Sequence, residues 1–179
     1  MSKQPKYLRR RQSGAVLIVS LLLLVVLTIL GVIMMQTTRM QERMSGATRD
    51  LNMALQGAEA GLRYGESLIN GYATQPVSVG SLPCTVCQTG VLPVAIYDDS
   101  QFNWSVNGQT YANAGLTGTS KLKANPQYVT EDIGGVRLDG LDTGQDPPVM
   151  REFYQVTARS TGATGIATTV LQSTYARIY

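Results

Sequence analysis

The sequence predicts an α+β protein in which a long N-terminal helix is followed by a small antiparallel β-sheet. Two observations indicate the helix: residues 15–35 form an uninterrupted apolar run, and apolar side chains then recur at helical spacing as far as residue 69. A third indicates the sheet, because residues near the C-terminus alternate with the period of a strand. No proline interrupts residues 6–75, so we expect one helix over residues 15–69, with its second half packed on the sheet.

The first half of this helix has the length and composition of a membrane span. No charged residue lies between Arg11 and Arg39. At about 1.5 Å of rise per residue, residues 15–35 extend about 30 Å, the thickness of the hydrocarbon core of a bilayer. Residues 1–11 carry basic side chains and no acidic ones. The positive-inside rule therefore predicts a single-pass chain with a cytoplasmic N-terminus and its C-terminal domain across the membrane.

The charge and composition exclude several kinds of function. The chain has 15 basic and 12 acidic residues, but five of the basic ones precede the helix, so residues 15–179 carry a net charge of −2. This balance gives no support for nucleic-acid binding. The absence of histidine removes the commonest metal ligand and general base, and we expect neither an enzyme nor a cofactor.

The second half of the helix is amphipathic. Its opposite face is polar and includes Glu59 and Arg63 as an i,i+4 pair. Asn70 and Gly71 predict the end of the helix, since glycine is favoured just beyond a helix C-terminus. Small residues in this half, Gly57, Ala58, Ala60 and Gly61, would allow close approach of a sheet or a neighbouring helix. The predicted apolar stripe consists of Met40, Met44, Ala47, Leu51, Leu55, Ala58, Leu62 and Ile69, with Gly65 filling the gap.

The strongest strand signals lie at the end of the chain. Residues 153–159 and 166–178 are rich in β-branched and aromatic residues and flank a turn at residues 160–165, so they predict an antiparallel hairpin. Residues 127–131 predict a further strand, which residues 133–138 continue through a Gly-Gly turn. Short apolar runs occur at residues 91–97 and 102–106, the latter containing Trp104. The other segments between these elements are rich in glycine and polar residues and are predicted to be loops.

The junction between the basic leader and the apolar helix resembles the leader of a type IV prepilin. In such leaders a glycine directly precedes the helix, as Gly14 does here. The resemblance implies cleavage by prepilin peptidase after Gly14 and N-methylation of the new terminus at Ala15. The alternative is a plain single-pass anchor in which this glycine occurs by chance.

Further residues resemble the PilX-type minor pilins of type IV pili. The resemblance lies in Gln41-Glu-Arg-Met-Ser-Gly46, Arg49-Asp-Leu51, the Ala54–Arg63 segment, Pro126–Glu131 and Val170–Tyr175. It implies a type IV pilin-like fold divided into a cleaved leader (1–14), a transmembrane half-helix (15–36), an amphipathic half-helix (37–70) and a periplasmic β-rich domain (71–179).

The same resemblance implies a function. Minor pilins lie in the inner membrane, help to prime assembly of the pilus and are thought to form its tip. Their N-terminal helix contacts other minor pilins and the major pilin. This implies a structural protein that is incorporated into the pilus, with no enzymatic activity. It does not distinguish a motility pilus, a DNA-uptake pilus and a secretion pseudopilus.

One position departs from the pilin pattern. Most pilins carry a glutamate five residues after the cleaved glycine, and this chain has Val19 there. That glutamate is understood to compensate the N-terminal amine of a neighbouring subunit in an apolar environment, where an unpaired charge is costly. In lacking this glutamate, the chain is similar to the tip subunit of type II secretion pseudopili. We expect the chain to cap a filament, or alternatively to be a rare subunit that tolerates the loss.

Cys84 and Cys87 are the only cysteines, and three roles are open to them. A redox pair usually opens a helix, which the Pro- and Gly-containing surroundings do not indicate. A zinc site needs two more ligands, and neither histidine nor a third cysteine is present. A structural disulfide in an oxidising compartment is the favoured interpretation.

Two loops offer weaker candidate sites. Asp139, Asp142 and Asp146, interspersed with glycines, could supply oxygen ligands for calcium, although the spacing does not match an EF-hand and solvated acidic turns are far commoner. Residues 101–125 are rich in Tyr, Asn and Gly. In an alternative function, the chain is a tip adhesin on the pilin scaffold, and these residues form its contact surface.

Overall fold

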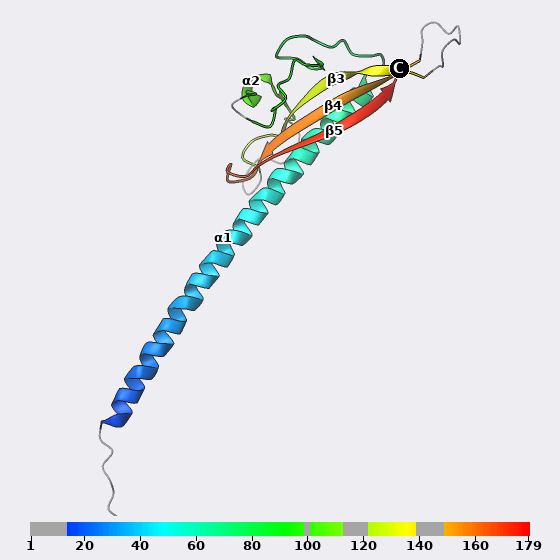
Figure 1. Ribbon diagram of the computed structural model, residues 1–179. Coiled ribbons are helices and arrows are strands. Elements are labelled where there is room, and N and C mark those ends of the chain that lie inside the picture. The colour runs from blue at the N-terminus through cyan, green and yellow to red at the C-terminus, as the bar shows by residue number, and fades with distance from the viewer. Residues whose placement is uncertain (1–13, 99–100, 113–121, 139–148) are drawn as a thin grey trace, which may run out of the picture. The chain divides into compact units, whose positions relative to one another are not determined.

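The computed structural model describes residues 14–98, 101–112, 122–138 and 149–179. The helix α1 spans Ala15–Gly71, so the predicted start is confirmed and the end lies two residues beyond the predicted one (Figure 1). Gly71 is the last helical residue and does not adopt a left-handed conformation. The chain divides into two compact units, one ending at Gly46 and the other comprising Ala47–Tyr179.

The second unit contains a mixed sheet of five strands. They are β1 (Cys87–Gln88), β2 (Gln109–Thr110), β3 (Gln127–Arg137), β4 (Met150–Thr161) and β5 (Thr168–Ile178). The order is β1-β3-β4-β5, with β2 also paired to β3. The predicted hairpin is confirmed by β4 and β5, which pair antiparallel without interruption from Arg151↔Ile178 to Thr161↔Thr168. The predicted α+β fold is confirmed with one difference: the short strand β1 runs parallel to β3, whereas the other pairs are antiparallel as expected.

Strand β3 continues through the Gly-Gly pair as predicted, but by a bulge and not a turn. Its register against β4 shifts between Asp132 and Gly134. Gly134 has a φ of 97°, a conformation that side-chain-bearing residues rarely adopt, and its N–H donates to Oδ1 of Asp132 at 2.9 Å. The local hydrogen bond and the glycine together let the strand absorb one extra residue and continue to Arg137.

Two apolar clusters lie on opposite faces of the sheet, because neighbouring residues of a strand point to opposite sides. One cluster, on the face covered by α1, consists of Ile69, Val86, Tyr154 and Val156. The other consists of Ile96, Phe102, Trp104 and Val129. Trp104 begins the short helix α2 (Trp104–Asn107), and its Nε1 donates to the carbonyl of Ile96 at 3.1 Å. The apolar segment 102–106 therefore contributes to the core as a helical turn.

Candidate functional site on the N-terminal helix

The helix begins at the predicted processing junction. Gly14 has a φ of 125° and stands directly before Ala15, and its carbonyl accepts the N–H of Ile18 at 3.3 Å. A residue with a side chain would be strained in this conformation, which favours glycine here. Residues 1–13 lie outside the described part of the chain. Cleavage after Gly14 and methylation of Ala15 stay predictions.

The first half of α1 presents an apolar surface on all sides. Every large apolar side chain from Val16 to Met35 is between 44% and 71% exposed. Of the described helices, α1 alone is long and apolar enough to cross a membrane. The hydroxyls of Ser20 and Thr28 donate to the carbonyls of Leu17 and Val25 at 2.9 and 2.8 Å. These polar groups are thereby satisfied within the helix, as an apolar environment requires.

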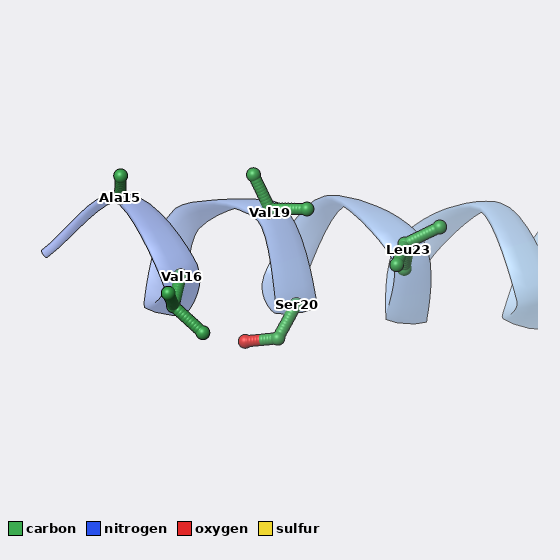
Figure 2. A pocket seen from close by; sticks show the side chains of 5 residues that line it. All are labelled: Ala15, Val16, Val19, Ser20 and Leu23. Atoms are coloured by element: carbon green, nitrogen blue, oxygen red, sulfur yellow. The ribbon is translucent and has the colours of Figure 1, made fainter. Parts of the chain in front are cut away.

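Val19 lines a shallow apolar depression on this surface. The depression has a volume of about 330 Å³ and is lined by Ala15, Val16, Val19, Ser20 and Leu23 (Figure 2). Val19 is 57% exposed, and the five lining side chains include no carboxylate. A neighbouring positive charge that approached this face would find only methyl groups and one hydroxyl.

In the second half of α1 the face on the sheet consists mainly of glycine and alanine, with Asp50 and Ile69 at its two ends. The buried residues of α1 are Asp50, Ala54, Gly57, Ala58, Gly61, Gly65 and Ile69. A Cβ atom on Gly65 would stand 2.7 Å from Cγ1 of Val156, and one on Gly61 would stand 3.2 Å from Cβ of Pro126. The helix backbone therefore approaches the sheet more closely than leucine side chains would allow.

This packing corrects the predicted apolar stripe. Ala58, Gly65 and Ile69 are buried as expected, but Leu51 and Leu55 are 54% and 38% exposed. Met40 and Met44 are also exposed. The small residues that permit close approach, Gly57, Ala58 and Gly61, are buried as expected, because close packing selects small side chains and leaves the larger ones on the flank of the helix.

Asp50 attaches the start of this segment to the β4–β5 turn. It is 6% exposed, and its carboxylate accepts hydrogen bonds from Oγ1 and N of Thr164 at 2.5 and 2.9 Å and from N of Ala167 at 3.3 Å. The bond from the Thr164 hydroxyl, then that from its N–H, lowers the pKa of Asp50, while burial opposes the shift. Sequence reasoning missed this residue, since its partners lie more than 110 positions away.

Two further contacts attach α1 to β5. Oε1 of Glu66 accepts from Oγ of Ser173 at 2.6 Å. The guanidinium of Arg177 donates to the carbonyl of Ile69 and lies 5.0 Å from the ring centroid of Tyr179. A basic group near the last carbonyls stabilises a helix C-terminus. Asp50 contacts the residues just before β5, and Ile69 contacts Arg177 near the C-terminal end of β5. This segment of α1 and β5 therefore run in the same direction.

A second carboxyl is buried on β4. Glu152 is 4% exposed, and its pKa is raised, chiefly by burial and further by the negative charge of Asp132. A hydrogen bond with the side chain of Gln75 acts in the opposite direction. This contact ties the chain that follows α1 to the sheet.

The remaining candidate residues are structural or lie elsewhere. Cys84 and Cys87 form a disulfide and are 3% and 1% exposed, within a turn whose residues Val79 and Val86 hydrogen-bond through their backbones. In the described residues, no group of three or more acidic, cysteine or histidine side chains could hold a metal. The calcium candidates Asp139, Asp142 and Asp146 lie outside the described residues, as does segment 113–121 of the proposed adhesin loop.

Comparison with known families covers almost the whole chain. The family model described as PilX N-terminal matches residues 13–63, and the one described as type IV pilus assembly protein PilX C-term matches residues 59–177. No curated protein and no solved structure matches the chain.

Proposed function

The chain belongs to the PilX family of type IV pilus assembly proteins, and from this we propose that it is a minor pilin that helps to prime the pilus and lies at or near its tip. The single observation that carries the proposal is the first half of α1, whose apolar side chains are all exposed. Burial of each CH₂ group contributes about 0.8 kcal/mol, so this surface requires lipid before assembly and other helices afterwards. The contacts made by the helices of other minor pilins and of the major pilin meet this requirement.

The proposal includes a defined maturation. The chain enters the inner membrane with residues 1–14 in the cytoplasm and the β-rich domain in the periplasm. Prepilin peptidase then cuts after Gly14, and Ala15 becomes the methylated terminus. The position of Gly14 immediately before the first helical residue supports this scheme.

Intact-mass measurement of the chain, from membranes of cells with and without prepilin peptidase, tests the maturation. We expect a peptidase-dependent loss of residues 1–14 and a methyl group on the remaining chain. A chain of full length in both membranes would refute the pilin interpretation and leave a plain anchored domain.

Val19 supports a position at the end of the filament. Within a filament, each subunit's glutamate at this place is thought to pair with the amine of a neighbour, and the depression around Val19 offers no such group. The Val19→Glu variant should therefore be incorporated in more copies per sheared pilus, whereas Val19→Gln, which adds polarity without charge, should behave as the original chain. Equal incorporation of all three would refute a capping role. The absence of a glutamate at position 19 also fits the alternative function, the tip subunit of a type II secretion pseudopilus.

The adhesin alternative depends on residues 101–125, of which 113–121 lie outside the described residues. It predicts that changes in this loop reduce attachment to surfaces and leave piliation intact. Counting pili and attached cells for the same loop variant distinguishes the two functions.

A further inference from the structure

Residues 36–49 of α1 are exposed along their whole length, unlike the residues that follow them. The buried face of α1 begins only at Asp50. Residues 15–35 are apolar enough to lie in lipid, whereas residues 36–49 include four charged side chains and belong in water. The first compact unit also ends within this stretch, at Gly46. The helical state of these 14 residues therefore depends largely on their own sequence.

That sequence favours a helix only weakly. Without tertiary packing, a helix of about 12–15 residues is marginally stable in water. The stretch contains three threonines, which lose side-chain freedom in a helix, and it places the like charges of Arg39 and Arg43 four residues apart. Ser45 and Gly46 then stand next to one another, and pairs of glycine and serine are frequent places of helix bending.

Gly46 is not explained by packing. A Cβ atom there would meet nothing within 4 Å, whereas one on Gly57 or Gly65 would lie 2.2 or 2.7 Å from side-chain atoms of β4. The later glycines therefore permit the close approach of α1 to the sheet. Gly46 weakens the helix without permitting any closer contact with the described residues.

One turn beyond Gly46 the helix is held by the sheet. The carboxylate of Asp50 accepts hydrogen bonds from N of Thr164 and N of Ala167 at 2.9 and 3.3 Å. Ala54 and Ala58 are fully buried. Local opening of a protein occurs where buried contacts are few and backbone hydrogen bonds are exposed to water. In α1 these conditions are met before Asp50 and not after it.

We propose that Ser45 and Gly46 form a hinge in α1, at which the helix opens and recloses while residues 50–71 stay packed on the sheet. Hinges consist of a few residues, often small ones, that absorb a change in backbone angles. The opening leaves the direction of the membrane anchor independent of that of the β-rich domain. This inference uses the apolar anchor and not the pilus function, so the two are tested separately.

Hydrogen exchange of the full chain in lipid nanodiscs, measured by mass spectrometry, tests the hinge. We expect the amides of residues 42–49 to exchange on the order of tenfold or more faster than those of residues 54–69, because only the latter lie in the packed part. Gly46→Ala should slow exchange at residues 42–49 about fivefold, since alanine favours the helix over glycine. The matched control is Gly31→Ala, at another open position of α1, which should leave this exchange unchanged.

Distances between spin labels provide a second measurement. The variants Arg39→Cys and Gln56→Cys place two labels at exposed positions on either side of the hinge, about 25 Å apart along an unbroken helix. We expect a broad distribution that includes shorter distances, and a narrower one when Gly46→Ala is added. The control pair Asn52→Cys and Ser67→Cys, also exposed, lies within the packed part and should give a narrow distribution.

Exchange at residues 42–49 as slow as at residues 54–69, or equal widths for the two label pairs, would refute the hinge. Unchanged exchange and an unchanged distribution in Gly46→Ala would also refute it, since the opening would then not depend on this glycine. Slower exchange in Gly46→Ala together with a narrower distribution supports it. Whether the chain is found in sheared pili decides the proposed function and leaves the hinge unaffected.

Discussion

Gly65 provides a quantitative test of the close packing between α1 and the sheet. Alanine has a higher helix propensity than glycine by about 1 kcal/mol, so Gly→Ala stabilises a helix where space is free. At Gly65 the added Cβ would lie 2.7 Å from Cγ1 of Val156 and 3.2 Å from Cδ2 of Tyr128, both in fully or almost fully buried side chains. Overpacking of this kind costs about 1–3 kcal/mol. The two effects together predict that Gly65→Ala lowers the free energy of unfolding by up to about 2 kcal/mol.

Gly71 is the matched control, because it belongs to the same helix and a Cβ there would meet nothing within 4 Å. Gly71→Ala should leave the stability unchanged or raise it by up to about 1 kcal/mol. Urea unfolding of the full chain in detergent, followed by the fluorescence of buried Trp104, measures both variants.

The double variant Gly65→Ala with Val156→Ala removes the clashing methyl groups, so its stability loss should be smaller than the sum of the single losses by about 0.5–3 kcal/mol. If Gly65→Ala proved as stable as Gly71→Ala, or if the two changes were additive, the close approach deduced from these distances would be incorrect.

Three other predictions concern stability. Because the pKa of Asp50 is lowered, its contribution to the free energy of unfolding is complete above the ordinary value of 3.8 and is lost as pH falls through the folded-state pKa. Asp50→Asn should remove this acid-sensitive step from urea midpoints measured against pH. For Glu152 the sign is opposite: its raised pKa opposes folding above the ordinary value of 4.5, and acidification relieves this effect. Glu152→Gln should therefore raise the urea midpoint at pH 7 and flatten its dependence on pH above 4.5, while an unchanged midpoint would count against the buried carboxyl. Replacing Cys84 and Cys87 by serine opens a very short loop and should reduce the free energy of unfolding by about 2 kcal/mol, measured against the parent chain with and without reductant.

The elements with long, regular patterns could be predicted from the sequence. The start of α1 at Ala15 and the β4–β5 hairpin follow from apolar periodicity sustained over many residues. The strands β1 and β2 could not, because two residues carry no period. Their place is set by pairing with β3 and not by local preference.

The sequence singles out some of the residues discussed above and gives no indication of the role of others. Gly14, Ala15 and Val19 are singled out by the resemblance to prepilin leaders and pilins, and their roles stay predictions. The docked face of α1 is predicted in part. The small residues Gly57, Ala58 and Gly61 are buried against the sheet as expected, whereas Leu51 and Leu55 of the predicted stripe are exposed. Asp50 belongs to a segment that resembles the PilX-type pilins, but nothing in the sequence indicates its role: a single acid on a helix is ordinarily solvated, and only the folded hairpin supplies its donors.

The parallel course of α1 and β5 determines how the domain bears mechanical load. A tension applied at Gly46 along the helix axis acts in shear on the contacts of Asp50, on the bond from Ser173 to Glu66 and on the bond from Arg177 to Ile69. Contacts loaded in shear share the force and fail together, whereas contacts loaded perpendicular to the strand would open one after another. Resistance to forced unfolding is governed by the unfolding rate. The attachment of the helix at both ends of β5 therefore suits this domain to being pulled by its N-terminal helix.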